Sequence, residues 1–247
     1  MLPSPDACYP LDAGTPGDPA AGVPLAAGRK GDPARAAAVK AGAPQVEFEY
    51  QGDVNPFAAD PKFPREAFPQ LAGGAGNGCT VRNVLFCRFT YGDCWMVDLG
   101  YGVDGPTAGR ELCETLTVFR FSDRLRVPAF HLAPRGDAGP WRNATPRLHA
   151  VDALVGTDLA GRYSLAALDA DAMRAIFDAE GCRKLAASPL AGRWRLDGAG
   201  QFIVASLAGQ LSDAGDLKTH YERMEQIAGT MGLRVTRYLW PEKTAAH

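Results

Sequence analysis

Cysteine, histidine and aspartate side chains in the middle of the sequence are of the types that a thiol-dependent enzyme needs. Cys79 follows the glycine-rich residues 73–78, whose backbone amides could stabilise a thiolate. A cysteine nucleophile also needs an imidazole base and a carboxylate that orients this base. His131 and Asp98 are available for these roles, and Cys94 is a second candidate thiol. The sequence is therefore compatible with a small-molecule hydrolase or transferase that uses Cys79 or Cys94 with His131.

Structural roles are favoured for several other residues of these kinds. Residues 73–78 lack the lysine of a phosphate-binding loop and lead into a strand, so an ordinary loop is the better interpretation. Cys87 alternates in phase with Leu85 and Phe89, and Cys113 falls within an expected strand, so both are interpreted as small core hydrophobes. The cysteines show no tight spacing, and we therefore expect reduced thiols in a cytosolic protein.

Asp98 and His131 have the most informative positions among the polar residues. Asp98 interrupts an otherwise apolar strand, and a structural ion pair with Arg82 or Arg88 on the neighbouring strand is favoured over a general-base role. His131 is out of phase with the apolar residues beside it, so it is expected to face solvent or a cleft. His, Cys and carboxylate residues show none of the spacings typical of metal sites, and we predict no metal and no cofactor.

Composition and charge argue against several classes of function. The 247 residues carry 26 basic and 28 acidic side chains, a net charge of -2, and 46% of them are hydrophobic. This is globular composition, and the balanced charge argues against binding to nucleic acid or to an anionic membrane surface. The sequence has no signal-peptide pattern and no run of about 18 apolar residues. We therefore expect a soluble, cytoplasmic protein without an integral membrane segment.

The chain is organised around alternating apolar residues in its middle. Residues 81–134 contain four apolar-rich segments of period two, separated by turn signals, which is typical of an antiparallel β-meander. Pro128 and Pro134, at the ends of the fourth segment, predict an edge strand or an irregular one. The expected strands are 46–50, 81–89, 94–101, 111–121, 127–133 and 163–167, followed by a hairpin of 194–196 and 202–207 with its turn at 197–200.

Helical patterns occur before and after the meander. Pro33 opens a short helix that Gly42 closes, and residues 52–78, rich in proline and glycine, are expected to form a long loop. Asp169 is the expected N-cap of a later helix, which ends or bends at Gly181.

A longer amphipathic helix is expected near the C-terminus. Ser212 is its expected cap and Gly232 its expected end, with 233–240 as a last strand. Its apolar stripe must pack on a sheet face and consists of Leu217, Tyr221, Met224, Ile227 and Met231.

Together these patterns predict an α+β fold with a mainly antiparallel sheet of about six strands and two or three helices packed on one face. Residues 1–33 are expected to be a disordered or loosely packed tail rich in Pro, Gly and Ala. Residues 34–240 are expected to form a single domain, and residues 241–247 a frayed C-terminus.

A series of short motifs extends through residues 81–229. The motifs are RNVL at 82–85, VDLGY at 97–101, VPAFHLAP at 127–134, Asp169, Trp194, Gly198 and the segment 209–227. Together they resemble an uncharacterised bacterial α+β domain of unknown function that is usually attached to N-terminal transmembrane helices. The resemblance implies the same fold class and supplies no catalytic residue. In contrast to that family, no membrane helix precedes Arg29, and Leu99 stands where an aromatic residue is usual.

The leading functional hypothesis is a non-catalytic cytosolic module that binds a protein or membrane-protein partner. The alternative is the thiol-dependent enzyme, whose candidate residues are Cys79, Cys94, His131 and Asp98, with His149 as a further imidazole. Convergence of a sulfur, an imidazole and a carboxylate would favour the enzyme, whereas thiols dispersed in the core and an exposed apolar patch would favour binding.

Overall fold

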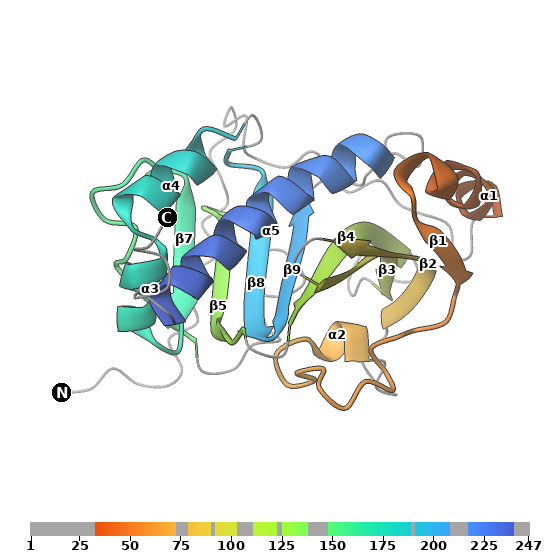
Figure 1. Ribbon diagram of the computed structural model, residues 1–247, viewed down its shortest axis with the longest axis horizontal. Coiled ribbons are helices and arrows are strands. Elements are labelled where there is room, and N and C mark those ends of the chain that lie inside the picture. Colours follow the sequence, from red (N-terminus) through yellow and green to blue (C-terminus); the bar gives the residue numbers. More distant parts are fainter. Residues whose placement is uncertain are drawn as a thin grey trace.

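One antiparallel β-sheet forms the centre of the molecule (Figure 1). The computed structural model describes residues 33–72, 79–89, 92–102, 111–122, 125–137, 148–188, 191–207 and 217–239. Within these residues the sheet has nine strands in the order β1-β2-β3-β4-β9-β8-β5-β7-β6. The α+β class and the antiparallel sheet are confirmed, but the sheet is larger than the predicted six strands.

The strands are β1 (Glu49–Gly52), β2 (Cys79–Phe89), β3 (Gly92–Gly102), β4 (Glu111–Phe121), β5 (Val127–Pro134), β6 (His149–Ala150), β7 (Tyr163–Ala167), β8 (Trp194–Gly200) and β9 (Phe202–Leu207). The helices are α1 (Pro33–Gly42), the 3-10 helix η1 (Ala43–Val46), α2 (Pro69–Ala72), α3 (Ala170–Ile176), α4 (Ala179–Ala186) and α5 (Leu217–Leu239).

The predicted meander is present as β2, β3 and β4, which pair in sequence order. Gly92 is at the start of β3, next to β4, and has a φ of +156°. A Cβ at this position would collide with the backbone carbonyl oxygen of Arg120. The close approach of the two strands therefore requires glycine here.

The hairpin of β8 and β9 makes the sheet larger than predicted, because it lies between β4 and β5. It joins the meander to β5, so β5 is an interior strand between β8 and β7 and not an edge. The predicted irregularity is present, since the register of β5 and β8 shifts between Val127 and Phe130, around Pro128. A proline has no N–H for a sheet hydrogen bond, which explains the shift.

Helix α5 crosses one face of the sheet, and α3 and α4 pack beside it (Figure 1). The predicted contact between meander and helix stripe is confirmed: Leu85, Phe119 and Phe130 share one buried core with Met224 and Ile227. Tyr221 is only partly buried and meets the ring of Phe48 edge-on at 5.0 Å. The expected cap, Ser212, lies outside the described residues.

The predicted end of this helix at Gly232 and the strand at 233–240 are wrong. Helix α5 continues to Leu239, and Val235, one turn beyond Met231, is fully buried. A Cβ at position 232 would lie 2.7 Å from a ring carbon of Phe121. Gly232 therefore allows the helix to approach the sheet closely, and does not stop it.

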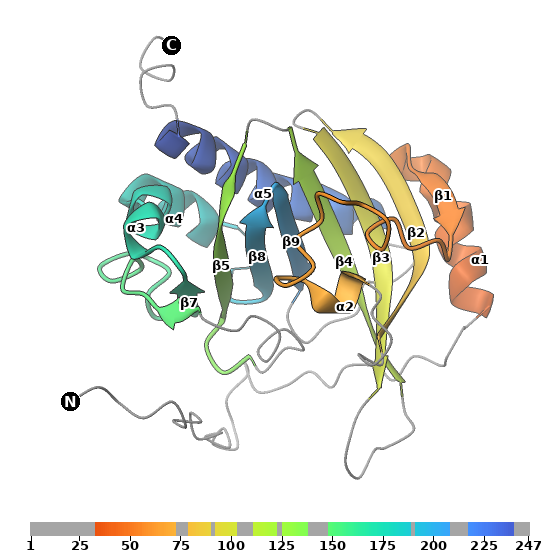
Figure 2. The same cartoon turned by 90° about the horizontal axis from the view of Figure 1, so that it is seen from below.

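The opposite face of the sheet carries a second layer that was predicted to be only a long loop. Residues 53–72, which end in α2, cross β4 and β9 on the side away from α5 (Figure 2). Four of their side chains are at most 4% exposed: Phe57, Phe63, Phe68 and Leu71. They share a second core with sheet residues that include Trp95 and Phe202. The prediction of helices on one face is therefore wrong, because α2 and its aromatic segment cover the other.

Helices α3 and α4 each begin at an aspartate. Asp169 is the N-cap of α3, as predicted, and accepts a hydrogen bond of 2.9 Å from the amide of Ala172. Gly181 does not end this helix. It lies inside α4, where its amide donates to the capping carboxylate of Asp178 at 2.7 Å.

Candidate functional site

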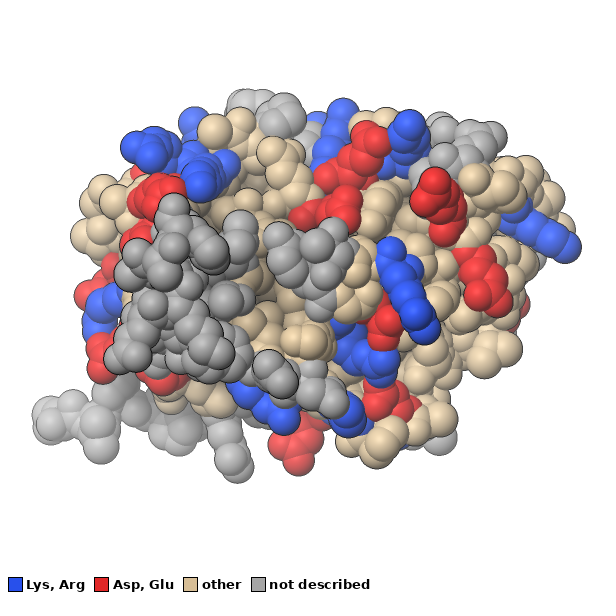
Figure 3. Space-filling view, in the orientation of Figure 1, with Lys and Arg blue, Asp and Glu red and all other residues tan. Residues whose placement is uncertain are grey.

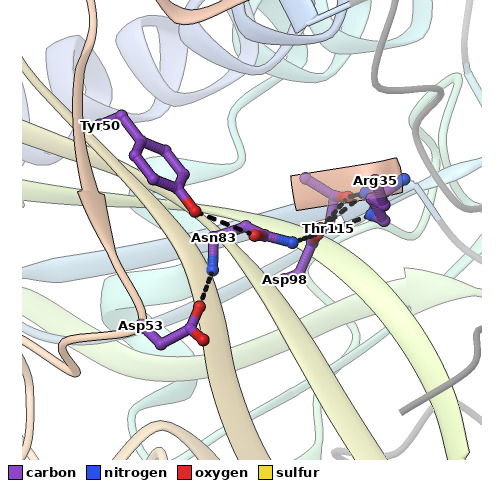
Figure 4. Close-up of polar contacts among 6 residues, drawn as sticks. All are labelled: Arg35, Tyr50, Asp53, Asn83, Asp98 and Thr115. Atoms are coloured by element: carbon purple, nitrogen blue, oxygen red, sulfur yellow. Dashed lines mark hydrogen bonds and ion pairs between the residues drawn. The ribbon is translucent and has the colours of Figure 1, made fainter. Parts of the chain in front are cut away.

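Asp98 is the centre of a buried polar network on the α5 side of the sheet (Figure 4). It is on β3, in phase with the core residues Cys94 and Met96, and its side chain is 4% exposed. Arg35 of α1 donates from Nε and Nη2 to the two carboxylate oxygens, each at 2.6 Å. Bidentate contacts of this kind are the strongest ion pairs in proteins.

Two further donors bind the same carboxylate. Nδ2 of Asn83 donates to Oδ2 of Asp98 at 2.8 Å, and Oγ1 of Thr115 is 2.8 Å from Oδ1. Nη2 of Arg35 also contacts Oγ1 of Thr115 at 2.7 Å. Neighbouring side chains therefore engage both oxygens of this buried carboxylate. The geometry supports a structural role for Asp98.

Asn83 links this network to the edge of the sheet. It has a left-handed φ of +50° within a register shift of β2, which asparagine tolerates better than most residues. Its amide donates to Asp53 at 3.0 Å, and the hydroxyl of Tyr50 donates to its side-chain oxygen at 3.4 Å. Burial, with Asp53 and Asp98 nearby, raises the pKa of Tyr50. The network therefore joins α1, β1, β2, β3 and β4.

Asp98 thus forms the predicted ion pair, but its bidentate partner is not on the neighbouring strand where the sequence analysis placed it. Arg35 lies 63 residues earlier in the chain. Arg82 is opposite Asp98 in the register of β2 and β3, and Arg88 is opposite Asp93.

Replacing Arg35 with methionine should destabilise the fold and loosen α1. The change removes the bidentate donor of the buried Asp98 carboxylate, and the loss of one partner of a buried ion pair costs about 3–5 kcal/mol. Because Arg35 retains some exposure, we expect a loss near the lower limit, measured by urea unfolding. Amide exchange in α1 should accelerate more than in α5.

Arg174→Met is the matched control for Arg35→Met. Arg174 pairs with Asp152 at 2.7 Å, but both side chains are more than half exposed. Exposed pairs contribute little, so this variant should unfold like the wild type. Equal stability of the two variants would show that Arg35 and Asp98 do not form the buried pair.

His131 is held by the carboxylate of Asp197. The sequence pattern predicts this aspartate in a turn. Nδ1 of His131 on β5 is 2.6 Å from Oδ1 of Asp197 on β8, and the two residues are directly opposite in the strand register. The Asp197 side chain is 6% exposed and that of His131 is 18% exposed. A carboxylate oxygen accepts hydrogen bonds, so Nδ1 of the imidazole is the donor in this contact. This arrangement orients the imidazole and could support proton transfer.

Arg195 forms a second buried ion pair and lies on the same face of β8 as Asp197, two residues away. Nη2 of Arg195 contacts Oε1 of Glu114 on β4, and Nε of Arg195 is 3.3 Å from Oδ2 of Asp137. Arg195 is 2% exposed and Glu114 is fully buried. We call Arg195, Glu114 and Asp137 the Arg195 cluster. Sequence reasoning missed it, although Glu114 is in phase with the buried residues Leu116 and Val118 of its strand.

Burial and the neighbouring charges shift the pKa values of this cluster in opposite directions. Burial raises the pKa of Glu114, although Arg195 and a hydrogen bond from Ser206 act in the other direction. Burial lowers the pKa of Arg195, but the carboxylates of Glu114, Asp137 and Asp197 raise it overall. The guanidinium therefore stays charged, whereas Glu114 is the member of the pair that can neutralise by binding a proton.

The candidate thiols are separated from His131. Cys94 on β3 is fully buried, and this burial raises its pKa well above the ordinary value. Cys79 at the start of β2 is partly buried, and burial raises its pKa too. A high pKa keeps a thiol protonated and unreactive.

Distance along the sheet also separates these groups. Strands β3 and β5 are four places apart in the sheet order, which corresponds to about 19 Å at the usual strand spacing. Cys94 belongs to the core under α5, whereas His131 is out of phase with the core residues Phe130 and Leu132 and faces the other side. The structure therefore does not bring Cys79, Cys94, His131 and Asp98 together.

Comparisons with known proteins give one structural likeness. No family model and no curated protein matches the chain. The chain is similar to the crystal structure of the mycobacterial trehalose monomycolate transport factor A, TtfA, with 12% sequence identity and a TM-score of 0.49. The match covers 81% of this chain and 95% of that chain. The resemblance of the sequence motifs to a membrane-associated α+β family accordingly remains a prediction.

Two further properties concern the described residues only. Their helices include none that combines the length and apolar character needed to cross a bilayer. Their His, Cys, Asp and Glu side chains form no group of three or more that could hold a metal ion.

His149 is on the exposed two-residue strand β6, at the end of the sheet order.

Proposed function

We propose that this protein is a non-catalytic module that binds a protein partner. The observation that carries the proposal is the exposure of two large apolar side chains in the segment that flanks β7. Val155, in the loop before β7, is 76% exposed, and Leu168, directly after β7, is 59% exposed. We infer that both side chains contribute to one surface, because exposed apolar surface is typical of sites that associate with other proteins.

The loop that carries Val155 is fixed to the rest of the fold. Its residues Ala153, Leu154 and Leu159 are buried, and the amide of Val155 donates to the carbonyl of Asp152 at 2.9 Å. Because this loop is already ordered, little conformational entropy of the loop is lost when a partner binds Val155.

The segment that carries Val155 and Leu168 also carries charged side chains, in the loop and in α3. Arg174 donates to Asp152 at 2.7 Å and to Asp171 at 2.7 Å, and thereby ties the loop to α3. Leu168 lies immediately before the N-cap of the same helix. We call Val155, Leu168, Asp152, Asp171 and Arg174 the α3 surface. An apolar centre with a polar rim is the usual anatomy of a protein interface.

Acidic and basic side chains are interspersed over the described residues of the face that carries α5 (Figure 3). A mixed surface of this kind favours solubility and gives no strong attraction to a nucleic acid. The candidate catalytic groups support the same proposal, because Asp98 is taken up by structural donors and the thiols are far from His131.

Site-specific photo-crosslinking in cells of the source organism tests this function. A photoreactive residue at position 155 or 168 should capture the same single protein. The same residue at position 54 is the matched control, because Val54 is 69% exposed but follows β1, at the opposite end of the sheet order. That position should capture a different and diffuse set of proteins, or none.

Reconstitution with the captured protein completes the test. The double variant Val155→Asp/Leu168→Asp should bind the purified partner at least about tenfold more weakly, whereas Val54→Asp should bind like the wild type. Unchanged circular dichroism would show that each variant is folded. Equal crosslinking from all three positions, or equal binding by both variants, would contradict the proposal.

A further inference from the structure

Cys87 and Cys94 lie directly opposite each other on the hairpin of β2 and β3. Both point to the side of the sheet that α5 covers, since Cys94 is part of that core and Cys87 packs against it. A hydrogen bond joins the two thiols. Both are free thiols in this structure, and neither belongs to the α3 surface.

The backbone at this pair suits a disulfide. Directly opposed residues of antiparallel strands have Cα atoms about 4.5–5.5 Å apart. Disulfides in proteins join Cα atoms separated by about 4.4–6.8 Å. The first range lies entirely within the second, so the disulfide can form without a change in the register of the hairpin.

The two thiols have different surroundings. Cys94 is fully buried, whereas Cys87 is only partly buried, near Tyr221 of α5. Hydrogen bonds from Cys94 and from Tyr221 lower the pKa of Cys87, although burial and nearby carboxylates oppose them. Burial, together with the neighbouring Cys87, raises the pKa of Cys94. Cys87 is thus the more acidic and more accessible thiol, and Cys94 is a protected one beside it.

We propose that Cys87 and Cys94 are a redox modification site that forms a reversible cross-strand disulfide with a hydroperoxide as oxidant. The Cys87 thiolate attacks the peroxide, so that an S–O bond forms, the O–O bond breaks and hydroxide or an alkoxide leaves. The Cys94 sulfur then attacks the Cys87 sulfenic acid, so that the S–S bond forms and water leaves. The two thiols lose two electrons in total, and the peroxide gains them. A dithiol restores the reduced pair by thiol–disulfide exchange.

The site goes beyond the proposed binding function and stands independently of it. Its position connects it to α5, because Tyr221 contacts Cys87 and also packs on Phe48. Oxidation removes the hydrogen bonds that Cys87 makes as a thiol or thiolate, and so changes the contact between the hairpin and α5.

Peptide mapping of the full-length protein tests the proposal. Reduced protein is treated with hydrogen peroxide, the remaining thiols are alkylated, and the protein is digested with trypsin. Cleavage after Arg82, Arg88 and Arg110 places the two cysteines on separate peptides, 83–88 and 89–110, each with a single cysteine. We expect these two peptides to be joined, with a mass lower than their sum by two hydrogen atoms, and to separate after treatment with dithiothreitol.

Single variants test the order of the two steps. Cys94→Ser should retain a reactive Cys87, detected as a sulfenic acid adduct with dimedone. Cys87→Ser should leave Cys94 reduced, because it is fully buried. Cys79 is the internal control, since burial raises its pKa and it should react more slowly than Cys87.

The wild-type peptide map is decisive even if a variant fails to fold. Peptides 83–88 and 89–110 that remain fully alkylated after peroxide treatment would overturn the proposal. A predominant link between either peptide and another cysteine would overturn it as well.

Discussion

Replacing Arg195 with methionine is expected to lower the free energy of unfolding by about 3–5 kcal/mol. Arg195 and Glu114 are both almost completely buried, so the change leaves a carboxylate in the core without its partner. The loss should be measured by urea unfolding near neutral pH, with circular dichroism as the probe.

The loss should depend on pH in a direction set by Glu114. Burial raises the pKa of Glu114 in the folded protein above its ordinary value of 4.5, and removal of Arg195 takes away the charge that opposes this rise. A carboxyl group with a raised folded pKa binds more protons in the folded state, so its contribution to stability falls as pH increases from about 4.5 through the folded pKa. The effect of Arg195→Met should therefore be smallest near pH 4.5 and larger at neutral pH.

The double variant Arg195→Met/Glu114→Leu is the control for this interpretation. Replacement of both members of a buried pair by apolar residues is often close to neutral, because the fully buried carboxylate is removed together with the arginine. The double variant should recover most of the free energy of unfolding that Arg195→Met loses. Because it lacks Glu114, its free energy of unfolding should also lose the part of the pH dependence that this residue causes. A single variant that costs less than about 1 kcal/mol would show that this pair is not a buried ion pair.

The parts of the fold that the sequence predicted well are those governed by local patterns. Strand β7 occupies the expected residues, and the aspartate at position 169 caps α3 as expected. The meander and the stripe of α5 follow from periodicities of two and 3.6 residues, which depend only on neighbouring positions.

The parts that the sequence did not predict are governed by distant contacts. Residues 53–72 have little regular structure, and their burial depends on aromatic side chains that meet the sheet. Gly232 fits a helix end by its local propensity, but the ring of Phe121 requires a glycine inside the helix at this point. In both cases tertiary packing overrides the local signal.

The candidate site shows the same division. The phase of Asp98 and His131 in their strands predicts special roles for both residues, but it does not predict their partners. Arg35 is 63 residues from Asp98, and Asp197 is 66 residues from His131. Asp197 was also assigned to a turn, because the sequence Asp-Gly usually marks one. The strand β8 instead continues to Gly200, which places Asp197 opposite His131.

Replacing Phe202 with alanine is expected to destabilise the protein by about 3–5 kcal/mol, because truncation of a buried phenylalanine leaves a cavity. Phe202 on β9 is fully buried, and Phe63 from the covering segment meets its ring edge-on at 5.0 Å. The variant should also loosen residues 53–72, because this segment contributes no strand to the described sheet and packs on it through side chains. Urea unfolding measures the first effect, and limited tryptic cleavage after Lys62 or Arg65, both exposed, measures the second.

A double-mutant cycle separates the ring contact from the rest of the loss. Phe63→Ala and Phe202→Ala should be coupled by about 0.5–1.5 kcal/mol, the range for aromatic pairs. Val54→Ala is the matched control in the same segment, because Val54 is 69% exposed and its truncation should change neither stability nor cleavage. If Phe202→Ala unfolds like the wild type, or if residues 53–72 resist trypsin as well as they do in the wild type, then the aromatic contacts do not hold this segment on the sheet.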